Sequence, residues 1–287
     1  MRDLERFNGI PNRALGSTGV RVTVLGVGGY HIGKAKDPKL GVRIIRAAID
    51  EGINFLDNAW CYNGGLSERI MGQALRDGYR DRVFLMTKNH GRDPATFESQ
   101  LEDSLRRLQT DYIDLLQFHE IVHDQDPPRI LDDVLDTAVK ARDAGKVRFL
   151  GFTGHRWPYL FRQMLHSGFA WDTVQFPANL LDAQYRSFTK AILPILKERG
   201  IGAIGMKSLA GGELLKAGIS PSEGIAYALS LPIDTLVSGI DSLEILGQNL
   251  ATARGWTPLT EVERQDLLER AAPYADDGHL EKYKAAS

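Results

Sequence analysis

Two sets of residues in this chain have the types and spacing for chemistry, and both include His119. The first is the string His119-Glu120-Ile121-Val122-His123, which has the two histidines and the glutamate of a zinc-protease motif. The second set is dispersed: Asp57, Tyr62 and Lys88 end or follow earlier apolar runs, and His119 ends another. A carboxylate, a phenol, an amine and an imidazole that meet are suited to proton transfer.

The zinc string requires a helix, because only there do side chains four positions apart share a face. The sequence instead favours a short strand and a loop. Residues 115–118 form a brief apolar run, and Asp124, Asp126 and Pro127-Pro128 follow closely, as they do in turns. No nearby Glu or His at a helical spacing offers the third ligand that a catalytic zinc needs. We keep a zinc metalloprotease as a remote alternative and predict no metal.

The dispersed set needs strand ends that meet, and the chain alternates short apolar runs with amphipathic ones throughout, as strands alternate with helices. The strand candidates are residues 24–27, 53–56, 83–86, 113–118, 149–152, 173–176, 202–206 and 235–237. The helix candidates lie near residues 39–51, 67–77, 95–108, 129–144, 157–167, 187–199, 221–230 and 242–252.

Several helix boundaries are marked by capping residues. Asp93-Pro94 places an N-cap before a proline in the first turn. Residues 220–223 and 260–263 read as capping boxes, and the second opens a final helix to about Ala271. Glycines that follow helical runs predict helix ends at positions 52, 145, 168 and 200.

Eight strand–helix units predict a (β/α)₈ barrel, whose typical size is about 250 residues. A doubly wound open sheet is the alternative, since its sequence pattern is similar. Before the first unit, Gly19 lies between two short alternating segments of residues 12–22, which predicts a hairpin that caps the barrel bottom. We expect residues 1–287 to form a single domain, with a loosely ordered polar tail over residues 273–287.

The composition is that of an ordinary globular protein, with 43% hydrophobic and 25% charged residues. The net charge of −2 and the lack of a basic block argue against nucleic acid or a membrane surface as a partner. No apolar stretch of 18 residues predicts a transmembrane helix. The single cysteine, Cys61, cannot form an internal disulfide, so we expect a cytoplasmic protein.

In a barrel, residues at the C-terminal ends of different strands meet at one mouth. Asp57, Lys88 and His119 then lie at three successive strand ends, and Tyr62 lies in the loop beyond the first of them. A buried lysine and a buried aspartate are costly unless they pair. The pattern therefore predicts an ion pair beside a phenol and an imidazole.

Residues 55–68, which read FLDNAWCYNGGLSE, resemble the signature of the aldo-keto reductase family. In that family an Asp is followed five residues later by the catalytic Tyr and then by Gly and Ser-Glu, as Asp57 and Tyr62 are here. Lys88 and His119 fall where the family has its Lys and His. Residues 15–19 resemble the opening hairpin, and residues 205–212 and 239–249 resemble the cofactor loops, so the resemblance spans about residues 12–252.

The resemblance implies an oxidoreductase that reduces an aldehyde or ketone to an alcohol by hydride transfer from NAD(P)H. Tyr62 would be the general acid, Lys88 would lower the pKa of its phenol, and Asp57 would keep Lys88 charged. His119 would orient the carbonyl oxygen. We expect NADPH as the cofactor, with NADH as the alternative, a small carbonyl substrate, and a monomer or small homo-oligomer. A cofactor-binding sensor on the same fold is the alternative function.

Residues 26–31 read GVGGYH, which breaks the glycine fingerprint of Rossmann domains and fits a barrel that binds the dinucleotide in its mouth. By resemblance, the expected cofactor contacts are Gly28, Gly29, Tyr30, Asp57, Thr153, Gln175, Met206, Lys207, Ser208, Leu209, Gly211, Gly239, Asp241, Gln248 and Asn249. The expected walls of the substrate pocket are Tyr30, Trp60, Phe118 and Trp157.

Three positions depart from the family pattern. Gly154 stands where the family has an Asn that binds the carboxamide, and His155 is a possible substitute. Met206 stands near the position of an aromatic that stacks on the nicotinamide. Asp241 occupies a region where NADPH-preferring members have basic residues, and Arg254 is a basic residue that a neighbouring helix offers.

Overall fold

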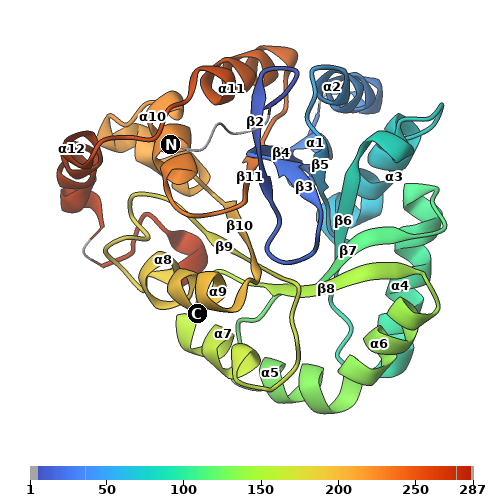
Figure 1. Ribbon diagram of the computed structural model, residues 1–287. Helices are drawn as coiled ribbons and strands as arrows, with labels where there is room; N and C mark the ends of the chain where they lie inside the picture. The colour runs from blue at the N-terminus through green and yellow to red at the C-terminus, as the bar shows by residue number, and fades with distance from the viewer. Residues whose placement is uncertain (1–5, 36, 276, 286–287) are drawn as a thin grey trace.

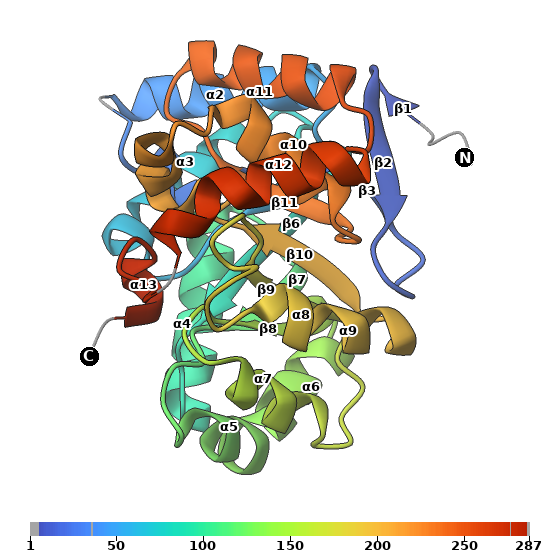
Figure 2. The same cartoon turned by 90° about the vertical axis from the view of Figure 1, so that its left-hand side faces the viewer.

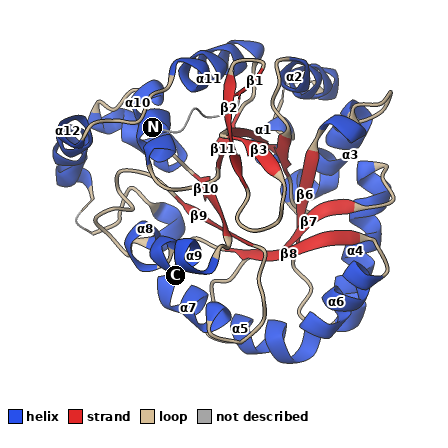
Figure 3. Cartoon of the chain, in the orientation of Figure 1, coloured by secondary structure: helices blue, strands red, loops and turns tan. Residues whose placement is uncertain are grey.

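The computed structural model describes residues 6–35, 37–275 and 277–285, and its centre is a closed barrel of eight parallel strands (Figure 1, Figure 3). The order around the barrel is β10-β11-β4-β5-β6-β7-β8-β9. The predicted (β/α)₈ fold is confirmed, and the open sheet is wrong because β11 pairs with β4. The strands are β4 (Leu25–Gly28), β5 (Phe55–Asp57), β6 (Phe84–Asn89), β7 (Ile113–Phe118), β8 (Val147–Thr153), β9 (Thr173–Pro177), β10 (Gly202–Met206) and β11 (Thr235–Gly239).

Helices surround the barrel, and no helix in the described ranges is long and apolar enough to cross a membrane (Figure 1). The longer ones are α2 (Pro38–Asp50), α3 (Leu66–Ala74), α4 (Pro94–Leu108), α6 (Leu135–Asp143), α7 (Pro158–Leu165), α9 (Leu193–Arg199), α10 (Pro221–Ser230), α11 (Leu243–Gly255) and α12 (Glu261–Ala271). The short ones are α1 (Gly29–Ile32), α5 (Asp126–Pro128), α8 (Phe188–Ala191), α13 (Lys282–Ala285), η1 (Tyr62–Gly65), η2 (Arg80–Arg82), η3 (Arg129–Val134), η4 (Ala210–Ala217) and η5 (Ala272–Tyr274).

The helix boundaries follow the capping signals. The side chain of Asp93 accepts a hydrogen bond from the N–H of Thr96 at 2.9 Å. The capping boxes predicted at residues 220–223 and 260–263 both form. The four glycines predicted to end helices are all left-handed, with φ of 103°, 77°, 83° and 67° at Gly52, Gly145, Gly168 and Gly200.

The predicted hairpin is confirmed and closes the N-terminal end of the barrel, within a sheet of β1 (Arg6–Phe7), β2 (Ile10–Ala14) and β3 (Arg21–Thr23). The N–H of Ser17 donates to the carbonyl oxygen of Gly200 at 2.8 Å, just before β10. Leu15 is fully buried. It joins the residues that fill the barrel interior, which are Val22, Phe55, Phe84, Met86, Leu115, Ile204 and Val237.

The segment after α12 packs on the C-terminal end of the barrel, on the opposite side from the hairpin (Figure 2). We expected a loosely ordered tail over residues 273–287. In the structure, Lys284 Nζ instead lies 2.7 Å from Asp182 Oδ1 and 2.9 Å from Glu281 Oε2, and all three side chains are fully buried. The polar residues that suggested disorder thus form an internal ion-pair cluster. Residues 276 and 286–287 of that expected tail lie outside the described residues.

Candidate active site

The four residues of the dispersed set come together at the C-terminal end of the barrel. Asp57 is the last residue of β5, Lys88 is the last but one of β6, and His119 directly follows β7. Tyr62 begins η1, in the loop beyond β5. Because β5, β6 and β7 are neighbours in the barrel, these side chains share one mouth.

Lys88 and Asp57 form a buried ion pair. Lys88 Nζ lies 2.8 Å from Oδ1 and 2.7 Å from Oδ2 of Asp57, and it donates a third hydrogen bond to the carbonyl oxygen of Asn58 at 2.8 Å. The two side chains are 1% and 3% exposed. The charge of the ammonium is thus compensated within the site, as a buried ion requires.

The Tyr62 phenol lies beside this ion pair. Tyr62 Oη is 3.5 Å from Lys88 Nζ. The Tyr62 ring stands edge-on to the Tyr30 ring, with 5.4 Å between centroids, and to the His119 ring at 5.9 Å. The turn that carries Tyr62 includes Gly65, whose φ is 81°. The phenol, the ammonium and the imidazole therefore border one space.

The surroundings keep Tyr62 protonated. Burial raises the pKa of Tyr62 well above its ordinary value, and the negative charge of Asp57 acts in the same direction. We expected Lys88 to lower this pKa. The ammonium is instead committed to Asp57 and Asn58, and burial lowers the pKa of Lys88 itself. Tyr62 therefore holds its proton at neutral pH.

His119 is neutral and belongs to a chain of three polar side chains. Burial and the charge of Lys88 place the pKa of His119 well below its ordinary value. His119 Nδ1 lies 2.9 Å from His90 Nε2, and the same His90 nitrogen lies 2.9 Å from Cys61 Sγ. A neutral imidazole has a single N–H. When His90 donates to Nδ1 of His119, that N–H is on Nε2, where it can serve a substrate.

Sequence reasoning missed His90, although one signal pointed to it. His90 stands two positions after Lys88, and alternate residues along a strand point to the same side. Its neighbour Cys61 is half-buried, and burial raises the pKa of the Cys61 thiol.

The zinc-protease alternative is wrong. Residues 119–122 are neither helix nor strand, so the two histidines of the string do not share a helical face. His123 is exposed, and its backbone N–H donates to Asp126 Oδ2 at 2.8 Å. The Glu120 carboxylate is paired with His155 instead of facing a metal with His119 and His123.

Gln175 reaches Asp57 from the far side of the barrel. It lies on β9, four strands away from β5, and its Nε2 donates to Asp57 Oδ2 at 2.8 Å. Its Oε1 is buried and has no hydrogen-bond partner among the described residues. A buried acceptor without a donor fits an amide N–H from a ligand, such as a nicotinamide carboxamide. Thr153, the neighbour of Gln175 in register on β8, is buried beside it.

Gly154 stands where the family has Asn, and the structure gives a steric reason. A Cβ at this position would come within 2.5 Å of the carbonyl oxygen of Ile121, so this backbone has no room for Asn. His155 does not take its place, because its ring pairs with Glu120 and its Nδ1 lies 3.0 Å from the carbonyl oxygen of Tyr283.

The glycines of the first loop are required by packing within the protein. A Cβ on Gly28 would come within 3.0 Å of the carbonyl oxygen of Ser238, and one on Gly29 within 2.7 Å of that of Asp57. Tyr30, which follows, is 43% exposed at the mouth.

The loop after β10 has open space beside its glycines, although the N–H of Gly212 already donates to the carbonyl oxygen of Leu209 at 2.8 Å. Gly211 and Gly212 have φ of 74° and 98°, and a Cβ on either would meet no atom within 4 Å. Lys207 is also left-handed, with φ of 58°. Concave turns of this kind bind anions through backbone N–H groups. The segment fits a pyrophosphate, and the expected contacts Met206, Ser208 and Leu209 belong to it.

The other expected cofactor loop begins α11, and its polar side chains are partly used within the protein. Asn249 Nδ2 donates to Ser238 Oγ at 3.1 Å in a buried position. Gln248 Nε2 donates to Glu244 at 3.3 Å on the surface. Asp241 lies between Gly239, the last residue of β11, and the cap of α11.

Arg254 is held away from that loop. It lies in the last turn of α11, and its Nη2 is 2.6 Å from Glu51 Oε2. Arg254 was considered as a basic residue for the region of Asp241, before the start of α11. That suggestion is wrong, because Arg254 lies at the other end of this helix.

Three of the four expected pocket aromatics lie at strand ends around the mouth. Tyr30 contacts Tyr62, and the Trp60 ring lies 6.4 Å from that of His90. The Trp157 ring is covered by Arg186 at 3.7 Å.

Phe118 is not a pocket wall. It is 2% exposed and packs against Phe97 and Trp171, at 5.7 Å and 5.9 Å between ring centroids, in the core between the barrel and its helices. As alternate residues of a strand face opposite sides, Phe118 points outward where Gln117 points inward.

The C-terminal segment covers one side of the mouth, which the sequence did not reveal. Tyr283 Oη accepts a hydrogen bond from Asn179 Nδ2 at 3.0 Å. Lys207 Nζ lies 4.8 Å from the centre of the Tyr283 ring. With the contact to His155, Tyr283 bridges the loops after β8, β9 and β10.

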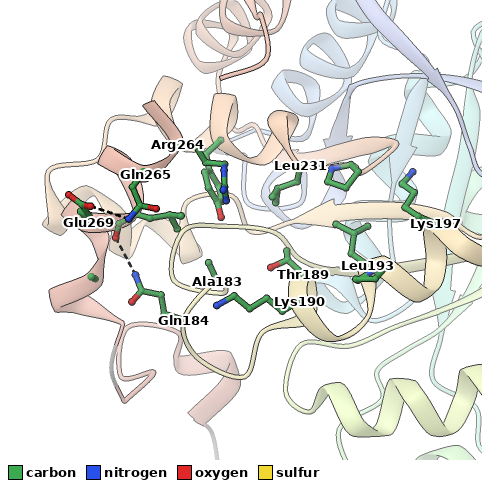
Figure 4. A pocket seen from close by; sticks show the side chains of 15 residues that line it. Ala183, Gln184, Thr189, Lys190, Leu193, Lys197, Leu231, Arg264, Gln265 and Glu269 are labelled. Atoms are coloured by element: carbon green, nitrogen blue, oxygen red, sulfur yellow. Dashed lines mark hydrogen bonds between the residues drawn. The ribbon is translucent and has the colours of Figure 1, made fainter. Parts of the chain in front are cut away.

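A surface groove of about 620 Å³ lies away from these residues (Figure 4). It runs between α12 on one side and the α8–α9 segment on the other, and none of its lining residues belongs to the site described above. Gln184 crosses it by donating to the carbonyl oxygen of Leu268 at 3.2 Å.

Comparisons with known proteins agree with this geometry. The model of the Aldo/keto reductase family matches residues 24–224. The chain is 33% identical to the aldo-keto reductase YhdN of Bacillus subtilis and 31% identical to the aldo-keto reductase AMT2 of Alternaria alternata, over 70% and 71% of its length. The matches cover 62% and 66% of those relatives.

A solved structure extends the similarity to the whole barrel. The holo form of the aldo-keto reductase AKR11C1 from Bacillus halodurans aligns with a TM-score of 0.76 and 26% identity. The alignment covers 91% of this chain and 96% of that one.

Proposed function

This chain belongs to the aldo/keto reductase family, and on that basis we propose that it reduces an aldehyde or ketone to an alcohol with NAD(P)H. The observation that carries the proposal is the placement of Tyr62 Oη, 3.5 Å from the Lys88 ammonium, beside a neutral His119. When bound, the nicotinamide supplies the hydride, which no side chain can supply.

The residues that would hold this cofactor offer matching groups. The unpartnered Oε1 of Gln175 would accept a hydrogen bond from the carboxamide, and the open turn at Gly211 would leave room for the pyrophosphate. Thr153 lies beside Gln175 and completes the carboxamide side.

The chain's own residues then bind and protonate the carbonyl oxygen of the substrate. His119 donates its Nε2 hydrogen to the carbonyl oxygen and holds it near Tyr62. As negative charge develops on that oxygen, Tyr62 gives up its proton, and the ammonium of Lys88, 3.5 Å from Tyr62 Oη, faces the phenolate that remains although its shorter hydrogen bonds go to Asp57 and Asn58. Asp57 keeps Lys88 charged and in place.

We propose NADPH as the preferred cofactor, following the family resemblance. The start of α11 carries Asp241 and Glu244, and a dianionic 2′-phosphate is better served by Arg or Lys. A fluorescence titration with both cofactors decides the preference, and NADH binding at least as tightly as NADPH would overturn it.

We propose that the protein acts in the cytoplasm on a small-molecule carbonyl compound. We expect it to be a monomer or a small homo-oligomer. Cys61 is a free thiol, as expected in a reducing compartment.

The test of the activity is cofactor oxidation against a panel of aldehydes and ketones, with Tyr62→Phe as the variant. We expect the variant to bind cofactor normally and to lose about 10²- to 10⁴-fold in turnover, the usual contribution of a general acid. Undiminished reduction by Tyr62→Phe would refute the role of the phenol. Cofactor binding by the native protein without turnover of any carbonyl would favour the sensor function.

A further inference from the structure

We propose that Cys61, His90 and His119 form a binding site for a divalent transition metal ion, with zinc as the best match. The three residues come from different elements: Cys61 from the loop after β5, His90 from the end of β6 and His119 from the end of β7. Their ligand atoms, Sγ of the cysteine and one nitrogen of each imidazole, all lie within 4.8 Å of one another. The fold, and not a local motif, brings them together.

The donor set and its spacing suit zinc. One thiolate and two imidazoles are common zinc ligands, with bonds of about 2.3 Å to sulfur and about 2.0–2.1 Å to nitrogen. Such bonds hold the ligand atoms of a tetrahedral site about 3.3–3.6 Å apart. The Cys61–His90 and His90–His119 contacts are both 2.9 Å and no pair of ligand atoms is more than 4.8 Å apart, so side-chain shifts of about half to one ångström would admit the ion.

Hydrogen bonding gives His90 Nε2 more close polar neighbours than it can bind at full strength. His90 Nε2 carries either one proton or one lone pair, but it has two polar neighbours at 2.9 Å. If it donates to His119, the Cys61 thiol has no lone pair on that nitrogen to bind. If Cys61 and His119 both donate, they compete for one lone pair. A metal ion takes one lone pair from each residue and removes the conflict.

The surrounding charges permit a cation here. The Lys88 ammonium is paired with both oxygens of Asp57, and Arg92 pairs with Asp126 at 3.0 Å, so these positive charges are offset in part. The carboxylate of Glu120 acts on Cys61 and His90, while the positive charges of Lys88 and Lys207 act on His119.

Three protein ligands leave one coordination position for water or a substrate oxygen. A bound ion draws His119 toward Cys61 and His90 and places a cation beside Tyr62. We therefore expect zinc to slow carbonyl reduction by about tenfold or more, since small misplacements of catalytic groups have effects of this size. This inhibition rests on the proposed function, whereas the binding of the metal does not.

The test measures binding of zinc and cobalt to the full chain, with Cys61→Ser and His123→Gln as variants. The native protein should bind one zinc ion and, with cobalt, show the charge-transfer absorption of a cobalt–thiolate bond. Cys61→Ser should lose that absorption and bind zinc about tenfold more weakly or worse. His123→Gln, the control, alters the exposed histidine of the same local string and should behave as the native protein.

The site is refuted if the native protein binds no stoichiometric metal, or if Cys61→Ser binds zinc as tightly as the native chain. A loss of binding in His123→Gln comparable to that in Cys61→Ser also refutes it, because the metal would then bind elsewhere. Inhibition is measured against the metal-free rate of each variant. If metal binds as expected but the protein reduces no carbonyl, the proposed function fails and the metal site stands.

Discussion

Asp57 and Gln175, on opposite strands of the barrel, are joined by a hydrogen bond of 2.8 Å across its mouth. The bond fixes the amide of Gln175 so that Nε2 faces the carboxylate. Its Oε1, buried and without a partner in the described chain, is then presented to a ligand. The orientation of the expected carboxamide acceptor is thus set by the Asp57 carboxylate, which also pairs with Lys88.

A first prediction concerns this acceptor. Gln175→Leu should weaken cofactor binding by about two- to tenfold, the value of one hydrogen bond. A dinucleotide with an acetyl group in place of the carboxamide should bind the native protein more weakly than the natural cofactor. In Gln175→Leu this difference should disappear. Fluorescence titrations of both proteins with both ligands measure the coupling, and a difference that persists in the variant would argue against the contact.

A second prediction concerns the pH dependence of turnover. Because the pKa of His119 lies well below its usual value, this residue stays neutral as pH falls through 6.5, and kcat/KM should not decline there. Because burial lowers the pKa of Lys88, the ammonium should lose its proton, and activity should fall, at lower pH than for an ordinary lysine. Profiles of kcat/KM against pH test both expectations. A fall in kcat/KM near pH 6.5 that is absent in His119→Gln would contradict the expectation for His119.

A third prediction concerns His90 as a positioning residue. His90→Leu removes the hydrogen-bond partner of His119 Nδ1 and should reduce kcat by about tenfold or more with little change in KM. His90→Gln retains an N–H donor and should recover part of the rate. Nitrogen NMR of the imidazoles should show the Nε2–H tautomer of His119 in the native protein and a mixture in His90→Leu. An unchanged tautomer would mean that His90 only fills space.

A fourth prediction concerns the cover of the mouth. Lys284→Met leaves the buried carboxylates of Asp182 and Glu281 without their cation, and breaking a buried pair costs about 3–5 kcal/mol. The matched control is Lys282→Met, because Lys282 is 77% exposed and its loss should change stability little. Thermal unfolding and hydrogen exchange over residues 277–285 compare the two. Equal stabilities would show that the segment is not held by Lys284.

Local signals account for most of the fold that the sequence predicted. Strand residues 113–118 and helix residues 221–230 have the predicted bounds, because turn residues and a capping box mark their ends. The predicted helix over residues 187–199 is divided at Ile192, since Pro194 has no N–H with which to continue it.

Site residues could be predicted from the sequence where they directly follow apolar strands. Contacts between side chains of different strands could not be predicted in this way. The positions of Asp57, Lys88 and His119 follow from their place after apolar runs. The bond from Gln175 and the cluster around His90 depend on which side chains face each other across the mouth. One buried partner of Lys284, Asp182, is likewise 102 positions away, and no local pattern encodes such a separation.

The pairing of β11 with β4, which sets Gly239 beside Gly28, also bears on how the protein folds. Each strand–helix unit can form from near neighbours, but this last pairing joins the two ends of the barrel and is slow to form because it closes a long loop. During refolding, helical signal should therefore return before enzymatic turnover. The time course of recovered turnover would then report when β11 pairs with β4 and the barrel closes.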